Sequence, residues 1–194
     1  MAKTRLGPTT LIYPMPATLV GAVVDGHPNF LAIAWCGVAA SQPPMLSVSL
    51  QGRRYTMKGI REHGQFSVNI PSVDQVREAD YCGIRSGATV DKVAVCGFDV
   101  FYGQLDRAPL IRQCPVNLEC RVVHMLHLGS HWLVVGEVVE THVSEECLTD
   151  GHPDVDRIRP FIFVTRPQAR YQAYGEVIAP AFRVGLEMEK PGGK

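Results

Sequence analysis

Apolar residues along this chain gather in short runs or alternate with polar ones, and turn residues separate the runs. This pattern is typical of β-strands. Residues 18–24 (TLVGAVV) form a β-branched run that ends at an Asp-Gly-His-Pro turn. Residues 30–40 continue as a second apolar run, and residues 45–50 (MLSVSL) alternate apolar and small polar side chains. The pattern predicts a strand in each of these three segments.

The rest of the chain also consists mainly of strand-like segments, with few helical patterns. Further strands are expected over residues 66–70, 98–102, 116–128, 132–143 and 161–164. Gly129-Ser130 separates the two longest runs and predicts a hairpin turn. Short helices are expected over 55–63, stopped by Gly64, and over 73–82, with Ser72 as N-cap. Residues 83–92 and 145–160 are expected to be irregular and polar, so the pattern predicts one closed or nearly closed β-barrel.

Length and composition are those of one ordinary folded domain. The 194 residues favour a single domain over 1–194, with a disordered tail after Glu187. Hydrophobic residues make up 46% and charged residues 20%, and the formal net charge is zero. A neutral chain gives no field that favours nucleic acid or an anionic membrane. No apolar run approaches the roughly 20 residues that a membrane helix needs.

The cysteines and the N-terminal residues favour a reducing compartment. None of the six cysteines forms a C-x-x-C pair, so neither a thioredoxin-type motif nor a zinc ribbon is visible. The first residues, MAKTRLGPTT, lack the apolar stretch of a secretory signal. We therefore expect a cytoplasmic protein whose cysteines are mostly small core residues.

The segment from Asn29 to Thr56 carries the most chemical information. It is expected to form two apolar strands joined at a Pro43-Pro44 corner, and it then reaches the start of a helix. Its small residues, Ala34 and Cys36 among them, let another molecule approach the strand backbone. Trp35 adds a large aromatic surface. A flat conjugated ligand could lie against such a strand.

The end of this segment favours an anion. Arg53 and Arg54 lie between a strand and a helix start, where phosphate groups commonly bind. Arg53 is preferred over Arg54 as the phosphate ligand, and Gln51 is a candidate contact to a ribityl chain. A flavin mononucleotide would use the aromatic surface, the small residues and the cations together.

Three alternative readings of the chemistry are disfavoured. His124, His127 and His131 resemble a metal motif, but the odd separation of His124 and His127 places them on opposite faces of a strand. Cys36 could be a redox thiol, yet nothing nearby in sequence marks it as activated. The chain contains neither a G-x-G-x-x-G run after a strand nor a P-loop, which disfavours Rossmann and P-loop chemistry.

An ordered series of short motifs resembles a known family over about residues 14–185. The motifs are Pro14-x-Pro16 with Val20-Gly21, Asn29 with Ala34-Trp35, Pro43-Pro44, Phe66-x-Val68-Asn69, Tyr81-Cys82-Gly83 with Ser86-Gly87 and Asp91-Lys92, Gly129-x-His131 with Gly136-Glu137-Val138, and Pro160 before an aromatic residue. Each motif alone is weak, but their order and spacing are fairly specific. The chain resembles the flavin reductase-like FMN-binding family, and within it the flavoredoxins.

This resemblance implies a mainly β fold, an FMN-binding split β-barrel of Greek-key antiparallel type with a few short helices. It also implies a set of flavin contacts, which comprises Asn29, Trp35, Thr56, Lys92, His131 and a C-terminal aromatic residue, Phe163 rather than Phe161. Val93 departs from the phenylalanine usual after Asp-Lys, so packing beneath that loop is expected to differ. The family builds its flavin sites beside a dimer interface, and the long apolar strands around His131 also favour a homodimer.

The function that follows is that of an FMN-binding oxidoreductase. The flavin would accept hydride or electrons and pass them on, so no catalytic side chain is assigned. Either NAD(P)H or a redox protein could be the donor. One alternative is an FMN-holding electron carrier without NAD(P)H turnover, and another is a split barrel that binds haem or no cofactor. A monoester phosphate pocket favours FMN over FAD.

Overall fold

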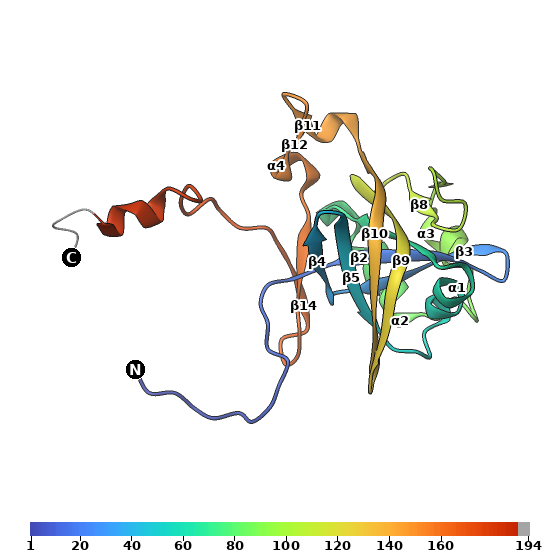
Figure 1. Ribbon diagram of the computed structural model, residues 1–194, viewed down its shortest axis with the longest axis horizontal. Helices are drawn as coiled ribbons and strands as arrows, with labels where there is room; N and C mark the ends of the chain where they lie inside the picture. Colours follow the sequence, from blue (N-terminus) through green and yellow to red (C-terminus); the bar gives the residue numbers. More distant parts are fainter. Residues whose placement is uncertain (190–194) are drawn as a thin grey trace.

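A seven-stranded antiparallel sheet carries most of the chain in the computed structural model, which describes residues 1–189 (Figure 1). Along the sheet, the strands are β3 (His27–Ile33), β2 (Thr18–Val24), β6 (Gln65–Ile70), β9 (Val116–Leu128), β10 (His131–Val143), β5 (Pro44–Leu50) and β4 (Cys36–Ser41). The smaller sheet contains β1 (Met15–Pro16), β13 (Phe161–Val164) and β14 (Arg170–Ala173).

The remaining elements are short. The α-helices are α1 (Tyr55–His63), α2 (Val76–Ile84), α3 (Lys92–Cys96) and α4 (Val155–Ile158). The 3₁₀ turns are η1 (Val73–Gln75), η2 (Glu145–Cys147) and η3 (Val184–Glu189), and two strand pairs are β7 (Val100–Phe101) with β8 (Leu110–Ile111) and β11 (Leu148–Thr149) with β12 (His152–Pro153). None of the helices in residues 1–189 is long and apolar enough to cross a membrane.

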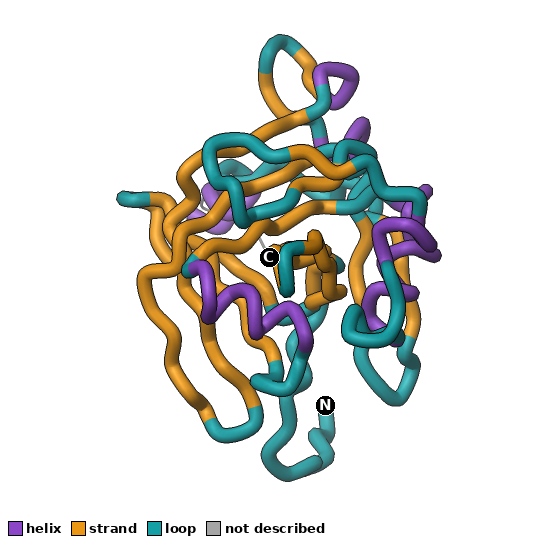
Figure 2. The backbone as a smooth tube through the Cα atoms, turned by 90° about the vertical axis from the view of Figure 1, so that its right-hand side faces the viewer, coloured by secondary structure: helices purple, strands orange, loops and turns teal. Residues whose placement is uncertain are grey.

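The sheet curls into a barrel because its two edge strands are neighbours in sequence. β3 and β4 lie at opposite ends of the strand order, yet only Ala34 and Trp35 separate them. The Trp35 carbonyl accepts a hydrogen bond from the Ser49 N–H at 2.8 Å, which fixes this crossing point against β5. Figure 2 shows the strands curving back on themselves. The structure thus confirms the mainly β barrel predicted from the sequence.

Two apolar clusters share strand β2, whose seven residues are all buried. Val20 and Ala22 point into the barrel, where they meet Phe66, Val134 and other strand residues. Leu19 belongs to an outer cluster with Phe30, Ala79, Cys82 and Phe161, which fixes α2 and β13 against the barrel. The period-2 alternation of a strand therefore serves two cores.

Helix α1 packs closely on β2, and its sequence explains how. A Cβ at Gly59 would lie 2.0 Å from the Val23 carbonyl oxygen, so only glycine permits this approach. The helix ends at Gly64, whose φ of 62° is the left-handed conformation expected of a C-cap glycine. The predicted helix over 55–63 with its glycine stop is confirmed.

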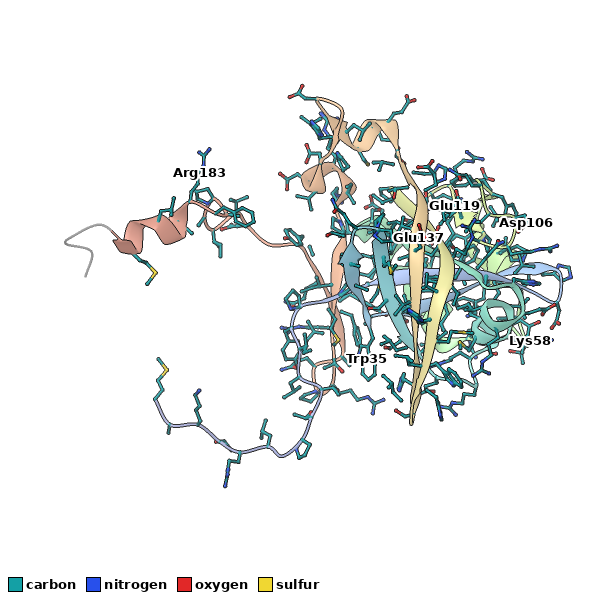
Figure 3. The ribbon with its side chains drawn as sticks, in the orientation of Figure 1. Trp35, Lys58, Asp106, Glu119, Glu137 and Arg183 are labelled. Atoms are coloured by element: carbon teal, nitrogen blue, oxygen red, sulfur yellow. The ribbon has the colours of Figure 1, made fainter. Side chains whose placement is uncertain are left out.

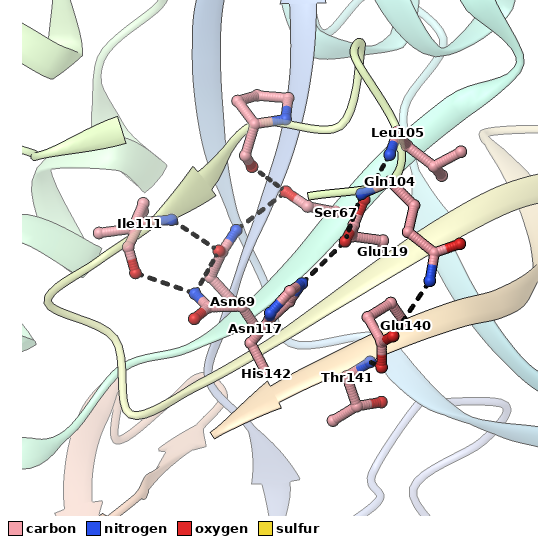
Figure 4. A network of polar contacts seen from close by, with 11 residues as sticks. Ser67, Asn69, Gln104, Leu105, Ile111, Asn117, Glu119, Glu140, Thr141 and His142 are labelled. Atoms are coloured by element: carbon pink, nitrogen blue, oxygen red, sulfur yellow. Dashed lines mark hydrogen bonds and ion pairs between the residues drawn. The ribbon is translucent and has the colours of Figure 1, made fainter. Parts of the chain in front are cut away.

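A buried polar network holds the segment from Gly103 to Ile111 against β6 and β9 (Figure 4). Glu119 is fully buried and accepts hydrogen bonds from the Gln104 and Leu105 N–H groups at 3.1 and 2.6 Å. Its carboxylate also meets His142 Nε2 at 2.8 Å. Nearby, Asn69 Oδ1 accepts from the Ile111 N–H at 3.0 Å and from Asn117 Nδ2 at 2.7 Å. The sequence showed no sign of this network, because its members are spread over four segments.

The expected strand over 30–40 is wrong in one respect that matters for the site. The chain stops pairing at Ala34 and Trp35, so Asn29 to Thr56 contains three strands rather than two. The pattern could not show this break, because alanine, tryptophan and cysteine continue the apolar run. The predicted corner at Pro43-Pro44 lies where β4 turns into β5, with Gln42 and Pro43 in the turn and Pro44 as the first residue of β5.

Two stretches expected to be irregular contain helices. α2 extends to Ile84, and α3 begins at Lys92, where the Asp91 carboxylate accepts a hydrogen bond from the Ala94 N–H at 3.1 Å. Residues 145–160 contain η2, the β11–β12 pair and α4. In both stretches local capping by an aspartate stabilises a helix too short to show periodicity.

Both ends of the described chain extend away from the barrel on one side (Figure 1). Strand β14 was not predicted, and η3 includes Met188 and Glu189, the first residues of the tail that was expected to be disordered. The rest of that tail, 190–194, lies outside the described residues. The longest predicted hairpin is confirmed, with β9 and β10 joined at Gly129-Ser130.

Candidate functional site

The β3–β4 crossing point opens into a cavity of about 510 Å³. Its walls come from the crossing point, from α2, and from the turn between β13 and β14, while Arg54 lies at the start of α1. The lining residues are Ala17, Thr18, Ala32, Ile33, Ala34, Trp35, Ser49, Arg54, Ala79, Asp80, Gly83, Ile84, His131, Phe163, Arg166 and Tyr171. We call this the main cavity.

Trp35 and His131 form an aromatic wall. Their ring centroids are 4.6 Å apart with a tilt of 36°. His131 Nδ1 also lies 2.8 Å from the Ser130 hydroxyl, and this hydrogen bond helps to fix the orientation of the imidazole. Trp35 is 41% exposed, an unusual state for so large an apolar side chain in the middle of a chain (Figure 3). A flat ligand would cover this surface.

Small side chains form part of the facing wall. Ala32 lies on β3, Ala34 lies in the crossing point, and Ala79 and Gly83 lie on α2. A Cβ at Gly83 would lie only 3.3 Å from the Ala32 Cβ, so larger residues would narrow the cavity. Ala34 was predicted, and Ala79 and Gly83 were missed. Their i, i+4 spacing, which places both on one face of a helix, was the signal that could have found them.

Arg54, rather than Arg53, lines the main cavity. It is the N-cap residue of α1, at the positive end of the helix dipole. Arg53 turns to the surface, where its Nε donates to Gln51 Oε1 at 2.9 Å. The sequence placed Arg53 and Gln51 together as ligand contacts, and the structure pairs them with each other instead. This geometry favours Arg54 over Arg53 as the phosphate ligand, and the ribityl role of Gln51 stays a prediction.

Asn29 and Lys92 line a neighbouring cavity of about 350 Å³. Asn29 is 5% exposed and donates from Nδ2 to the hydroxyl of buried Thr56 at 2.7 Å. This bond joins β3 to the first turn of α1, just after Arg54. The predicted residues Asn29, Thr56 and Lys92 therefore lie near the start of α1. The Thr56 hydroxyl accepts its hydrogen bond there from Asn29.

Lys92 is almost fully buried, with 3% of its surface exposed. Its Nζ donates to the carbonyls of Phe30 and Cys82 at 2.7 and 2.9 Å. Burial lowers the pKa of Lys92, the nearby Cys82 thiol partly opposes this, and the Arg54 charge lowers it further. The Arg54 charge thus disfavours the charge on Lys92, and an anion bound near Arg54 would relieve this repulsion.

Cys36 lines a third, mainly apolar cavity of about 350 Å³ with Trp35 and residues of the N-terminal segment. Burial raises the pKa of its thiol to about 11, partly opposed by a hydrogen bond with Thr18. The thiol is therefore neutral at physiological pH, which does not favour a nucleophilic or redox role.

Phe163 lines the main cavity, whereas Phe161 is buried in the outer core against Tyr171. The two residues are two apart in β13 and share a face of the strand, and both rings pack against Tyr171, so they differ in their position along the strand. The choice of Phe163 over Phe161 is therefore consistent with the geometry, and its contact with a ligand remains a prediction.

Two of the three histidines of the metal-like pattern stack on tryptophan side chains. His127 stacks on Trp132 with centroids 4.8 Å apart, and His131 stacks on Trp35. Within residues 1–189, no group of three or more histidine, cysteine, aspartate or glutamate side chains is arranged to hold a metal ion.

Comparison with known proteins gives a consistent result. Residues 10–164 match the model of the flavin reductase like domain. The fold matches flavoredoxin from Methanosarcina acetivorans with a TM-score of 0.92 and 39% identity, over 97% of this chain and 100% of that one. It matches flavoredoxin of Desulfovibrio vulgaris (Miyazaki F) with a TM-score of 0.88 and 40% identity, over 95% and 100%.

One characterised relative is similar in sequence. It is the reductase component of 4-nitrophenol 4-monooxygenase/4-nitrocatechol 2-monooxygenase from Rhodococcus opacus. It is 34% identical over 127 residues, which cover 66% of this chain and 65% of that protein.

Proposed function

Because the chain belongs to the flavin reductase like domain family, we propose that it binds FMN in the main cavity and acts as an oxidoreductase. In this role it accepts hydride or electrons into bound flavin and passes them to an acceptor. One observation carries the proposal: a single cavity is lined by an aromatic pair, by small residues and by Arg54 at the start of α1.

The residues fit the parts of FMN. The isoalloxazine ring would lie against Trp35 and His131, opposite Ala79 and Gly83. The phosphate carries about two negative charges near neutral pH. Arg54 and the positive end of the α1 helix dipole would hold it. A helix start that suits one terminal phosphate favours FMN over FAD.

The chain's own residues bind and orient, while FMN when bound supplies the hydride and electron chemistry. Asn29 holds Thr56 and so fixes the first turn of α1 beside Arg54. Lys92 ties β3 to α2 through the Phe30 and Cys82 carbonyls. Its charge raises the positive potential around Arg54. We propose that Ala34 and Cys36 offer backbone groups to the flavin, and that no side chain acts as acid or base.

A second candidate function is electron transfer without NAD(P)H turnover. The observation that favours it is the 39–40% identity to two flavoredoxins over nearly the whole chain. In that case a redox protein would reduce the bound flavin.

We also propose that the protein is a cytoplasmic homodimer. Large apolar side chains project from the two terminal segments, and Ile178 and Phe182 are 97% and 100% exposed in a single chain. Such exposure is typical of surfaces that a partner covers. All six cysteines are free thiols, which suits a reducing compartment such as the cytoplasm.

A visible absorption spectrum of the purified protein tests the cofactor. We expect a flavin spectrum, and FMN as the flavin released on denaturation. A haem spectrum, or a protein that remains colourless after incubation with FMN, would contradict the proposal. Steady-state oxidation of NADH and NADPH with free FMN or another acceptor then separates the two functions, because the carrier would show no turnover.

A further inference from the structure

Two cysteine side chains from neighbouring helices meet between α2 and α3. Cys82 on α2 is fully buried, and Cys96, the last residue of α3, packs against the same apolar cluster. The two thiols share a side-chain hydrogen bond. Lys92, at the other end of α3, donates from Nζ to the Cys82 carbonyl at 2.9 Å and so holds the two helices together. Neither thiol takes part in the proposed binding of FMN.

Cys96 is the more accessible thiol of this pair. It is half-buried and lines a cavity of about 520 Å³ beside Arg77, Glu78 and Val95. Cys82, in contrast, has no exposed surface. A small molecule that enters this cavity from solvent therefore reaches the Cys96 sulfur first, with the Cys82 thiol already hydrogen-bonded to it.

The surroundings of the pair favour Cys96 as the thiol that ionises first. Burial raises the pKa of both thiols, and that of Cys82 rises to about 12. The hydrogen bond between them raises the pKa of Cys82 and lowers that of Cys96. The Lys92 charge lowers both pKa values, while the Glu78 charge raises that of Cys96. Because the thiolate is the nucleophilic form, Cys96 is the better nucleophile of the two.

We propose that Cys82 and Cys96 form a reversible dithiol–disulfide site whose substrate is a small peroxide. The Cys96 sulfur attacks one oxygen of hydrogen peroxide, so that an S–O bond forms, the O–O bond breaks, and the departing hydroxide takes up the thiol proton as water. The Cys82 sulfur then attacks the sulfenic sulfur, so that the S–S bond forms, the S–O bond breaks, and the second hydroxide leaves with the Cys82 proton. Two thiols are oxidised by two electrons, and one peroxide becomes two waters.

Closing this bond needs only a small movement. The sulfur atoms of a disulfide lie about 2 Å apart, closer than two hydrogen-bonded thiols. Because Cys96 borders the cavity, its side chain has room to change rotamer toward Cys82. A thiol reductant restores the pair by exchange. Reduced flavins react with dioxygen, and peroxide is a product of that chemistry, so an FMN protein would meet this substrate.

The test maps disulfides in the folded, reduced wild-type chain after treatment with hydrogen peroxide. Free thiols are blocked, and tryptic peptides are analysed by mass spectrometry without reduction. Trypsin places Cys82 in residues 78–85 and Cys96 in residues 93–107, whereas Cys114 shares residues 113–121 with Cys120. Each pairing of these cysteines between peptides therefore gives its own mass.

We expect one disulfide within the chain, between Cys82 and Cys96, with the other four of the six thiols still free. Cys82→Ser should stop at a sulfenic acid on Cys96, which dimedone traps, and Cys96→Ser should leave Cys82 reduced. Cys114→Ser is the matched control, because Cys114 is buried in the same cluster as Cys82. It should form the disulfide as the wild type does.

Three results in the wild type would overturn the inference. Cys82 and Cys96 could stay reduced while peroxide oxidises other thiols, Cys82 could pair with Cys114 instead, or the expected disulfide could form only after urea has unfolded the chain. Circular dichroism before and after oxidation shows whether the chain is folded. A variant that fails to fold leaves this wild-type test intact. None of these results depends on bound FMN, so a protein without FMN contradicts the proposed function and not this inference.

Discussion

Arg53 and Arg54 are neighbours in sequence but serve different parts of the molecule. Arg54 lines the main cavity, while Arg53 pairs with Gln51 at the surface. The sequence could place an arginine pair between a strand and a helix, and it could not tell which of the two lines the cavity. That choice depends on where the helix starts relative to the cavity, which is a matter of a single residue.

The first prediction therefore concerns the phosphate. Arg54→Ala should weaken FMN binding about tenfold to a hundredfold, because one charged hydrogen-bonding partner of a dianion is lost. Riboflavin, which has no phosphate, should bind both proteins alike. Arg53→Ala is the matched control and should keep wild-type affinity for both flavins. Equal losses in the two variants, or a larger loss in Arg53→Ala, would show that the phosphate lies elsewhere.

At the scale of elements, the periodicity of the sequence predicted the secondary structure of long or well-capped segments correctly. The β9–β10 hairpin and helix α1 agree with the pattern because alternation, glycine stops and turn residues all act locally. The break between β3 and β4 was missed, since tertiary closure of the barrel, rather than local sequence, ends the pairing at Ala34 and Trp35. Helix α3 was missed because its five residues depend on a cap from Asp91.

The buried network around Glu119 should matter for the stability of the loop that crosses β6 and β9. Glu119→Gln replaces one acceptor oxygen by an amide that cannot accept, so at least one of its three partners loses its bond. We expect the free energy of unfolding to fall by about 1–3 kcal/mol. Chemical denaturation followed by circular dichroism measures this.

Glu140→Gln is the control for the same change of atoms. Glu140 is half-buried, and its carboxylate meets Gln104 Nε2 at 3.0 Å near the surface of the same segment. Its unfolding midpoint should match the wild type. If Glu119→Gln were as stable as Glu140→Gln, the network would not be what holds the loop.

At the scale of the whole molecule, the sequence predicted the barrel but only part of the site. Trp35, Ala34, His131 and Phe163 do line one cavity. Asp80, Arg166 and Tyr171 could not be found, because the α2 face and the β13–β14 turn meet only through packing that no local motif encodes. Lys92 was expected at the flavin, and its bonds to two carbonyls show that burial also gives it a structural task.

The terminal segments should decide the oligomeric state. We expect Ile178→Ser with Phe182→Ser to weaken the proposed dimer, since both side chains are almost wholly exposed in a single chain. Arg183→Ser, an exposed charged residue in the same segment, should leave the dimer intact (Figure 3). Light scattering over a dilution series measures the change. A wild type that is monomeric with flavin bound would contradict the proposed dimer.

Buried thiols should make the protein sensitive to alkali. Burial raises the pKa of Cys82 and of Cys114 from 9.0 to about 12 in each case, and it raises the pKa of Cys120 as well. The unfolded thiols release their protons above about pH 9, whereas the folded ones keep them, so the folded state binds more protons in that window. Stability is therefore fully present below pH 9 and falls as pH rises toward 12.

The expected slope is about 1.4 kcal/mol per pH unit for each thiol, or about 4 kcal/mol per pH unit for all three. Urea unfolding measured from about pH 8 to about pH 10.5 would show this fall in the free energy of unfolding. A variant with alanine at Cys82, Cys114 and Cys120 should have a much flatter dependence, whatever its absolute stability. An equally steep fall in that variant would assign the sensitivity to other groups.

The central claim is that FMN lies against Trp35 with its phosphate at the start of α1. The most direct measurement is a titration of the flavin-free Trp132→Phe protein, in which Trp35 is the sole tryptophan, with FMN and with riboflavin. The account predicts that one FMN per chain quenches Trp35 fluorescence, and that riboflavin does so at least about tenfold more weakly because it lacks the phosphate. FMN that binds without quenching Trp35, or riboflavin that binds as tightly as FMN, would contradict it.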